Sequence, residues 1–372
     1  MLDAWGEPGH PVLVAVLLYD VLAFAGAVFG IVRDARSGFR ASRWLALALC
    51  AAAGALFLTV AFRSLFVAAR LATDVLFLVL PPLLAAEAFL AVWRKRRTSA
   101  ALAAGGALLL ASTYAYAFHV EPHRLEITHH EIRSPKITRP VRVAILADIQ
   151  TDHIDDFEAR AIRAALEERP DLVLFPGDYL QVWDAGVHTR ESDRLRNLLR
   201  PATLTPSLGA FAIEGDCEAR GWERLFDGTA VRALSDESVD LPDAGIHLVG
   251  ISLAESRTGT GRLPALLAAA PPGRFVLVFG HAPEFALERH ARTSADLCIA
   301  GHTHGGQVVL PFFGPPVTMT RIPRHIAAGG LHPAGNGWVY VSRGIGMERG
   351  VAPRLRFLCR PEVGIIDLLP SS

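Results

Sequence analysis

The sequence predicts an α/β fold of two mixed β-sheets flanked by helices, preceded by an all-α transmembrane region of four helices. Two observations predict it. The apolar residues make up 51% of the 372-residue chain, and up to residue 118 they form four long runs. Beyond that point, short apolar runs alternate with amphipathic segments, a pattern typical of sheets covered by helices. We therefore expect a four-helix membrane region at 1–119 and one globular domain at 120–372.

The four apolar runs each have about the length that a helix needs to cross a bilayer, roughly 20 residues. They span residues 11–32, 44–62, 71–93 and 100–118. A cleaved signal peptide would be one shorter run before a small-residue cleavage site, so it does not explain four runs. Helices buried in a soluble domain rarely stay apolar on every face for this long. We expect a multi-pass protein whose first partner is the lipid bilayer.

Basic residues in the loops indicate how these spans are oriented. The loops after the first and third spans carry four basic residues each, namely Arg33, Arg36, Arg40 and Arg43, then Arg94, Lys95, Arg96 and Arg97. The loop after the second span has only Arg63 and Arg70. Because loops rich in Lys and Arg favour the cytoplasm, the amino terminus and the domain at 120–372 are expected on the outer face of the membrane.

Charge and cysteine content exclude two classes of protein. The formal net charge is zero, which argues against a nucleic-acid partner bound through a broad basic surface. The four cysteines, Cys50, Cys217, Cys298 and Cys359, are far apart and form no C-x-x-C pair. Neither a zinc ribbon nor a disulfide framework is therefore expected.

Five apolar runs in the second part each stop just before a residue of a type that binds metals. The runs and the residues that follow them are 141–146 with Asp148, 171–175 with Asp178, 209–213 with Asp216, 275–279 with His281, and 296–300 with His302. In an α/β sheet, ligands gather on the loops at the carboxyl ends of strands. Further predicted elements are helices at 157–169 and 191–199 and strands at 246–251, 339–342 and 363–368.

These five residues, together with His304, favour a site for two divalent metal ions. Carboxylates mixed with imidazoles suit Mn, which we favour, or Fe or Zn, better than Ca or Mg alone. Two metals that share a carboxylate can hold a hydroxide in line with a phosphorus atom and stabilise both the attacking and the leaving oxygen. Each residue alone would more often cap a helix or close a turn, so the prediction depends on the set.

The segment 301–307, Gly-His-Thr-His-Gly-Gly-Gln, follows Gly177-Asp178 and Gly280-His281 in the chain. In this order the motifs resemble the calcineurin-like metallophosphoesterase superfamily, most of all its bacterial membrane-anchored branch, from about Leu125 to the carboxyl terminus. The resemblance implies a four-layered sandwich and a location in the bacterial inner membrane. It also implies a set of ligands: Asp148 and His304 for the first metal, Asp178 as the bridge, and His281, His302 and residue 216 for the second.

Three positions depart from the pattern of this superfamily. Gln150 stands where a histidine is usual, and it remains open whether Gln150 or His153 binds the metal. Asp216 replaces an asparagine, which adds a negative charge to the second metal and is expected to weaken its Lewis acidity or shift the metal preference. Cys217 replaces the histidine that assists the leaving group, and Glu218 follows it, so the resemblance places both at catalytic positions.

The cysteine leaves two interpretations open. A thiol donates a proton to an alkoxide less well than an imidazolium does near neutral pH. Either the enzyme cleaves bonds whose leaving group needs little help, such as a pyrophosphate linkage or an activated diester, or its site is catalytically degraded. We favour the first.

The sequence as a whole predicts a membrane-anchored phosphoesterase with a dinuclear metal site. The expected reaction is hydrolysis of a phosphodiester or pyrophosphate bond, in a phosphorylated lipid or another envelope substrate, by a metal-activated hydroxide. One alternative is a UDP-2,3-diacylglucosamine-type pyrophosphate hydrolase on the cytoplasmic face, and another is a non-catalytic membrane scaffold on a degenerate fold. An apolar rim beside the site, or simply a packed loop, is expected from Phe312, Phe313, Pro315, Pro316 and Met319.

Overall fold

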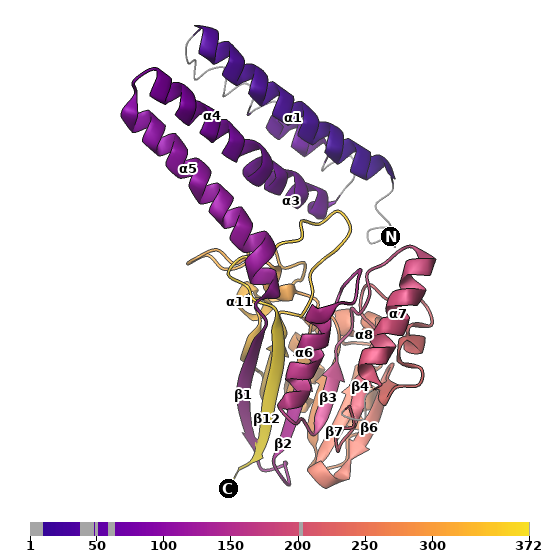
Figure 1. The fold of residues 1–372 in the computed structure, drawn as a ribbon. Helices are drawn as coiled ribbons and strands as arrows, with labels where there is room; N and C mark the ends of the chain where they lie inside the picture. Colours follow the sequence, from indigo (N-terminus) through magenta and orange to yellow (C-terminus); the bar gives the residue numbers. More distant parts are fainter. Residues whose placement is uncertain (1–9, 38–47, 49–50, 59–63, 201–203, 372) are drawn as a thin grey trace. The chain divides into compact units, whose positions relative to one another are not determined.

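The computed structural model describes the chain except for residues 1–9, 38–47, 49–50, 59–63, 201–203 and 372 (Figure 1). Its contacts divide the chain into two compact units. One unit is Met1–Val120 with Glu348–Arg354, and the other is Glu121–Met347 with Leu355–Ser372.

The first unit is helical. Among the described residues its α-helices include α1 (His10–Ser37), α3 (Leu65–Asp74), α4 (Leu80–Trp93) and α5 (Arg97–Ala115). A π-helical turn, η1 (Val75–Val79), joins α3 to α4, and another, η2 (Tyr116–Val120), extends α5. The π turn η1 lies just before Pro81 and Pro82, which have no backbone N–H with which to continue the regular helical bonding.

Three helical segments among the described residues are long and apolar enough to cross a membrane: Val14–Arg33, Leu65–Trp93 and Arg97–His123. They correspond to the first, third and fourth expected spans. Much of the second expected span, 44–62, lies outside the described residues, although residues 51–58 within it are helical. Membrane-spanning helices are thus supported by length and composition for three of the four predicted spans.

The second unit contains two mixed six-stranded sheets. The first sheet has the strand order β1 (Glu126–Ser134), β12 (Glu362–Pro370), β2 (Val141–Ile145), β3 (Leu172–Phe175), β4 (Ala210–Ala212) and β5 (Val231–Ala233). Figure 1 shows β12 between β1 and β2; it runs parallel to β1 and antiparallel to β2. From β2 to β5 all neighbours are parallel.

The second sheet has the strand order β10 (Gly330–Ala334), β11 (Gly337–Val341), β9 (Leu297–Ala300), β8 (Phe275–Phe279), β7 (Ile246–Gly250) and β6 (Glu237–Leu241). The four central strands are parallel, and the strands at both edges are antiparallel to their neighbours. Short 3-10 turns connect elements of this unit: η3 (Glu121–His123), η4 (Trp222–Phe226), η5 (Pro242–Ala244), η6 (Pro283–Leu287) and η7 (His304–Gly306).

Helices cover the outer faces of both sheets. The helices α6 (Asp156–Glu167) and α7 (Ala185–Leu199) pack on the first sheet, and on the second sheet lie α9 (Leu263–Ala268), α10 (Arg289–Ser294) and α11 (Arg324–Ala327). A further short helix, α8 (Leu253–Thr258), follows β7. Between the sheets, fully buried side chains such as Ile145, Leu174 and Leu277 form a third apolar cluster. This arrangement confirms the predicted sandwich of two sheets flanked by helices.

The strands that the apolar pattern predicted are the central ones. Strands buried on both faces appear in the sequence as continuous apolar runs, and β3 and β8 are buried along their whole length. The four strands that it missed, β1, β5, β6 and β10, are the four sheet edges. Edge strands face solvent and carry polar residues, as in the sequence Glu-Ile-Thr-His-His-Glu of β1, so no apolar run marks them.

Candidate metal centre

The side chains predicted to bind metals come from five loops at one edge of the two sheets. Asp148, Asp178 and Asp216 follow the parallel strands β2, β3 and β4, and His281 and His302 follow β8 and β9. Their ligand atoms form two groups, Asp148 with Asp178 and His281, and Asp216 with His281 and His302. Within each group these atoms lie within 4.8 Å of one another. The two groups share His281, whereas the shared residue expected from the sequence is Asp178.

The first group is fully buried and has ligand atoms available for a cation. His281 Nδ1 donates a hydrogen bond to the carbonyl of Pro176 at 2.8 Å, which directs Nε2 to within 3.4 Å of Asp178 Oδ2. Asp148 Oδ1 accepts the His302 backbone N–H at 3.0 Å. Asp148 Oδ2 and His281 Nε2 are buried without a hydrogen-bond partner among the residues that the structure describes. Buried polar atoms rarely lack a partner, and an imidazole held at one nitrogen is typical of a metal ligand, so this group fits a divalent metal.

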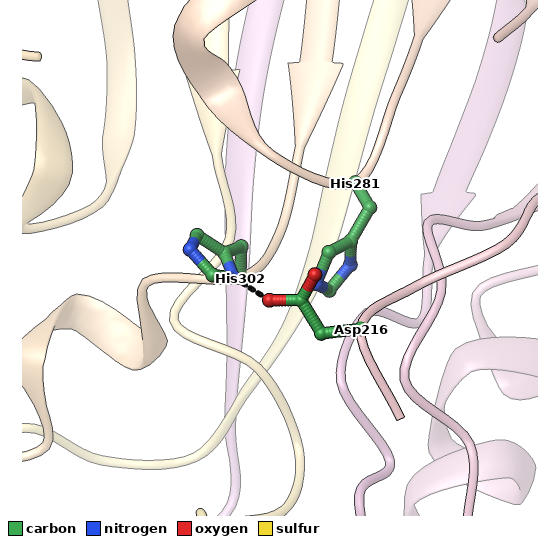
Figure 2. A group of neighbouring side chains, drawn as sticks. All are labelled: Asp216, His281 and His302. Atoms are coloured by element: carbon green, nitrogen blue, oxygen red, sulfur yellow. Dashed lines mark ion pairs between the residues drawn. The ribbon is translucent and has the colours of Figure 1, made fainter. Parts of the chain in front are cut away.

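Electrostatics in the second group also favour a cation. His302 Nδ1 lies 3.0 Å from Asp216 Oδ2, and Figure 2 shows both side chains beside His281. Burial is the largest single influence and disfavours the charged imidazolium. The hydrogen bond to Asp216, together with the negative charges of Asp216, Asp178 and Asp148, outweighs it and raises the pKa of His302 to about 9. For Asp216, burial is likewise outweighed, and the hydrogen bond and the charges of the histidines lower its pKa. Burial raises the pKa of Asp148 to about 7. Metal binding to such groups displaces protons.

Gln150, His304 and Cys217 lie together beside these two groups. His304 Nε2 and Gln150 Oε1 form a short hydrogen bond. The Gln150 amide nitrogen lies 3.2 Å from Cys217 Sγ and 3.2 Å from Gln181 Oε1. His153, the alternative to Gln150, is instead directed toward α7, where its ring lies 3.5 Å from Glu191, and its side chain is 58% exposed. The structure therefore favours Gln150 over His153 as a member of the site.

Glu218 connects the loops that carry the ligands. Its carboxylate accepts backbone N–H groups of Asp178 at 3.0 Å, Tyr179 at 2.8 Å and Gly215 at 2.7 Å. The two loops meet closely at Gly177, whose φ is +90° and where a Cβ would lie 2.7 Å from the Gly215 Cα. Because both carboxylate oxygens are occupied by backbone donors, we propose that Glu218 positions Asp178 rather than reacting with substrate.

The backbone at the site is strained. Five predicted ligands have a positive φ: Asp148 (50°), Gln150 (28°), Asp178 (57°), His302 (69°) and His304 (49°). This region is uncommon for residues with a Cβ, and such conformations cluster at functional sites because the surrounding structure must hold them.

Two arginines that the sequence did not single out support the ligand loops. Arg257 of α8 forms an ion pair with Asp216. Arg356 is fully buried, and its guanidinium donates to the carbonyls of Arg343, Gly344, Gly346 and Cys359 at 2.8 to 3.2 Å. A single arginine with no motif around it has no sequence signature, and only the fold brings each to its partner.

Arg257 provides a test of the extra charge on Asp216. We expect Arg257→Gln to tighten metal binding by about ten-fold, because the Asp216 carboxylate would no longer share its negative charge with a guanidinium and would attract the metal more strongly. Turnover should fall, because a metal held by an uncompensated Asp216 is a weaker Lewis acid. In the Asp216→Asn background the same change should alter metal affinity much less.

The measurement is the metal dissociation constant of the full chain in detergent, obtained by chelator competition for the wild-type chain, the two single variants and the double variant. Equal changes in the metal dissociation constant in both backgrounds would show that the ion pair between Arg257 and Asp216 does not control metal affinity. A rise in KM alone in both backgrounds would instead indicate that Arg257 contacts the substrate phosphate.

Comparisons with known proteins are consistent with this geometry. The profile of the calcineurin-like phosphoesterase family matches residues 141–306, a range that contains all of the predicted ligands. The uncharacterized metallophosphoesterase YkuE of Bacillus subtilis (strain 168) is 30% identical over 277 residues, which cover 71% of this chain and 93% of YkuE.

Two further relatives have named activities. The phosphodiesterase YaeI of Escherichia coli (strain K12) is 28% identical over 288 residues, covering 72% of this chain and 97% of YaeI. The UDP-2,3-diacylglucosamine pyrophosphatase LpxG of Chlamydia muridarum (strain MoPn / Nigg) is 22% identical over 326 residues, covering 69% of this chain and 93% of LpxG.

Proposed function

Because this chain belongs to the calcineurin-like phosphoesterase family, a family of metal-dependent hydrolases of phosphate esters, we propose that it cleaves a phosphodiester or pyrophosphate bond in a lipid or cell-envelope substrate. The main support for the proposal is the pair of buried atoms Asp148 Oδ2 and His281 Nε2, which belong to two adjoining groups of candidate ligands supplied by five loops. They support an intact site and argue against a degenerate scaffold.

The residues have distinct proposed roles. Two divalent metals, Mn in preference to Fe or Zn, would supply an activated hydroxide and stabilise the oxygens around phosphorus. Asp148, Gln150 and His304 would hold the first metal, and Asp216, His281 and His302 the second. Asp178 would lie between them, with its Oδ1 kept in place by the backbone N–H of Cys217 at 2.9 Å. The backbone N–H of Cys217 therefore orients the Asp178 carboxylate, the proposed bridge.

Cys217 determines which bonds the site is suited to cleave. Its Sγ lies 3.2 Å from the Gln150 amide nitrogen, and in the sequence motif it stands where the superfamily has the histidine that assists the leaving group. A neutral thiol donates poorly near neutral pH, so we propose that the leaving group departs with little proton transfer. Phosphate groups and activated alcohols are such leaving groups. The similarity to YaeI and LpxG supports the diester and pyrophosphate classes respectively.

The proposal is tested with the purified full chain in detergent. We expect Mn²⁺-dependent, chelator-sensitive cleavage of bis-p-nitrophenyl phosphate or a nucleotide pyrophosphate, faster than cleavage of p-nitrophenyl phosphate. Cys217→Ser should retain the rate within a few-fold, and Cys217→His should accelerate alkyl diesters, since general acid catalysis contributes about 10²–10⁴-fold. A loss of 100-fold or more in Cys217→Ser would show that the thiol takes part directly. Two bound metals without turnover would favour the scaffold, and no bound metal would overturn the proposal.

We also propose that the catalytic unit is on the outer, periplasmic face of a bacterial inner membrane. The support is the Arg-rich loops after the first and third expected spans. A UDP-2,3-diacylglucosamine-type substrate on the cytoplasmic face requires the opposite orientation. A reporter fused after Ser372 that is active only in the cytoplasm would favour that alternative.

A further inference from the structure

A turn next to the metal centre exposes a group of large apolar side chains. It spans residues 310–319, soon after the histidine segment, and we call it the apolar turn. The exposed fractions are 41% for Leu310, 111% for Phe312, 55% for Phe313, 42% for Val317 and 42% for Met319. Scattered single apolar residues are normal on a surface, but five within ten positions mark a contact surface.

The backbone of the turn holds these side chains outward. Leu310 and Gly314 exchange backbone hydrogen bonds of 3.0 and 2.9 Å, and Phe313 N–H donates to the Leu310 carbonyl at 3.2 Å. At the tip, Phe312 has a φ of +64°, a conformation that bulky residues rarely adopt. A smaller residue, such as glycine, would make the same backbone hydrogen bonds with less conformational strain at this φ. The turn itself therefore does not require an aromatic ring at its tip.

The apolar turn is linked to the predicted metal ligands. His302 Nε2 lies 3.3 Å from the carbonyl oxygen of Met319, at the end of the turn. The next residue, Thr320, donates its hydroxyl to Glu284 of η6 at 2.7 Å. A surface that binds the turn would therefore also hold the candidate metal ligands at a defined distance from that surface.

The charges beside the turn indicate which surface it contacts. Arg321 and Arg324 are exposed, and the Arg324 guanidinium lies 4.3 Å from the Phe313 ring centroid. Aromatic rings flanked by arginines suit a membrane interface, where rings enter the acyl boundary and cations meet anionic headgroups. The same chain has three segments that are long and apolar enough to cross a membrane. They would keep the whole chain attached to a bilayer.

We propose that the apolar turn inserts into the headgroup region of an anionic bilayer, with Phe312 and Phe313 as its anchors, and so places the metal centre at the membrane surface. This goes beyond the proposed hydrolysis and does not require turnover. It explains how a hydrolase could reach a bond close to the bilayer without extracting the lipid.

The test measures membrane depth on the full chain in nanodiscs of phosphatidylglycerol and phosphatidylcholine. A nitroxide is attached at Phe312→Cys in a Cys217→Ser background, and the background protein alone corrects for any label on Cys50. The matched control is Asp243→Cys, an exposed position before β7, at the sheet edge opposite the carboxyl ends of β7 to β9.

We expect the label at 312 to be relaxed by oxygen and shielded from a water-soluble nickel complex, with the opposite result at 243. Omitting phosphatidylglycerol, or replacing Arg321 and Arg324 with glutamine, should raise the nickel accessibility at 312. Equal nickel accessibility at both positions would overturn the proposal. Shielding from both relaxants would overturn it too, because it would place Phe312 against protein, either the chain's own helices or a second copy.

Discussion

Replacing Asp178 with asparagine is expected to lower hydrolysis by at least about 10²-fold and to reduce the metal content of the protein. Even outer partners of metal ligands contribute about 10–100-fold, and Asp178 is predicted to be a ligand shared by both metals. Its side chain lies between the Cys217 N–H at 2.9 Å and His281 Nε2 at 3.4 Å. The amide keeps the shape of the carboxylate but removes the negative charge that two cations require.

The measurement combines hydrolysis of bis-p-nitrophenyl phosphate with metal content determined on the same sample of the full chain. Asp227→Asn is the matched control, because Asp227 is an exposed carboxylate in the same unit. It should keep both the native rate and the native metal content. A native rate in Asp178→Asn would exclude Asp178 as the bridge, and the geometry of two groups sharing His281 would then be the better description.

Replacing Arg356 with methionine is expected to destabilise the catalytic unit by about 3 kcal/mol. Four carbonyls would lose their hydrogen-bond donor, and each loss lowers the free energy of unfolding by about 1–3 kcal/mol. Part of this loss is offset, because the variant no longer has to bury a charge. Burial lowers the pKa of Arg356, a sign of that desolvation cost. For a unit of this size the loss corresponds to a fall of about 6–12 °C in the midpoint of thermal unfolding.

The same substitution should also reduce activity through Asp148. Arg356 holds the loop in which Ile345 N–H donates to Ala147 at 3.0 Å and Gly346 N–H donates to Asp148 at 2.7 Å. At Gly344, with φ +70°, a Cβ would lie 2.8 Å from the Asp148 Cβ, so the loop closely supports this ligand.

Thermal unfolding and metal affinity of the full chain provide the test of Arg356. The exposed Arg232→Met is the matched control, since it removes the same groups from a solvated position. Arg356→Lys should restore little stability, because an ammonium cannot reproduce the forked donors of a guanidinium. An unchanged midpoint in Arg356→Met would show that solvent or rearrangement satisfies these carbonyls.

Sequence alone predicted five of the candidate metal ligands that the structure brings together, because the signals involved are local. The run before Asp148 becomes β2, and the run before His302 becomes β9. Central strands are buried on both faces and therefore continuously apolar, and parallel strands bring their carboxyl ends to one edge. That reasoning predicted which loops meet, and the histidine segment predicted the family.

Sequence reasoning could not assign roles within the centre. Glu218 was placed at a catalytic position, yet its carboxylate is engaged by three backbone N–H groups. The choice between Gln150 and His153 depends on which way one loop turns, and the structure directs His153 toward Glu191. Such outcomes follow from side-chain directions in a short loop, for which residue type carries no signal.

Composition and periodicity by themselves determined the apolar helices, the central strands and the set of candidate ligands, because each depends on neighbours within a few residues of the chain. Only the tertiary structure decided the sheet edges, the pairing of Arg257 with Asp216, the enclosure of Arg356 and the outward direction of Phe312. Some of these features bring together residues that are distant in sequence, and the others depend on whether a strand or side chain is exposed to solvent. Both kinds of feature follow from how the sheets and loops pack.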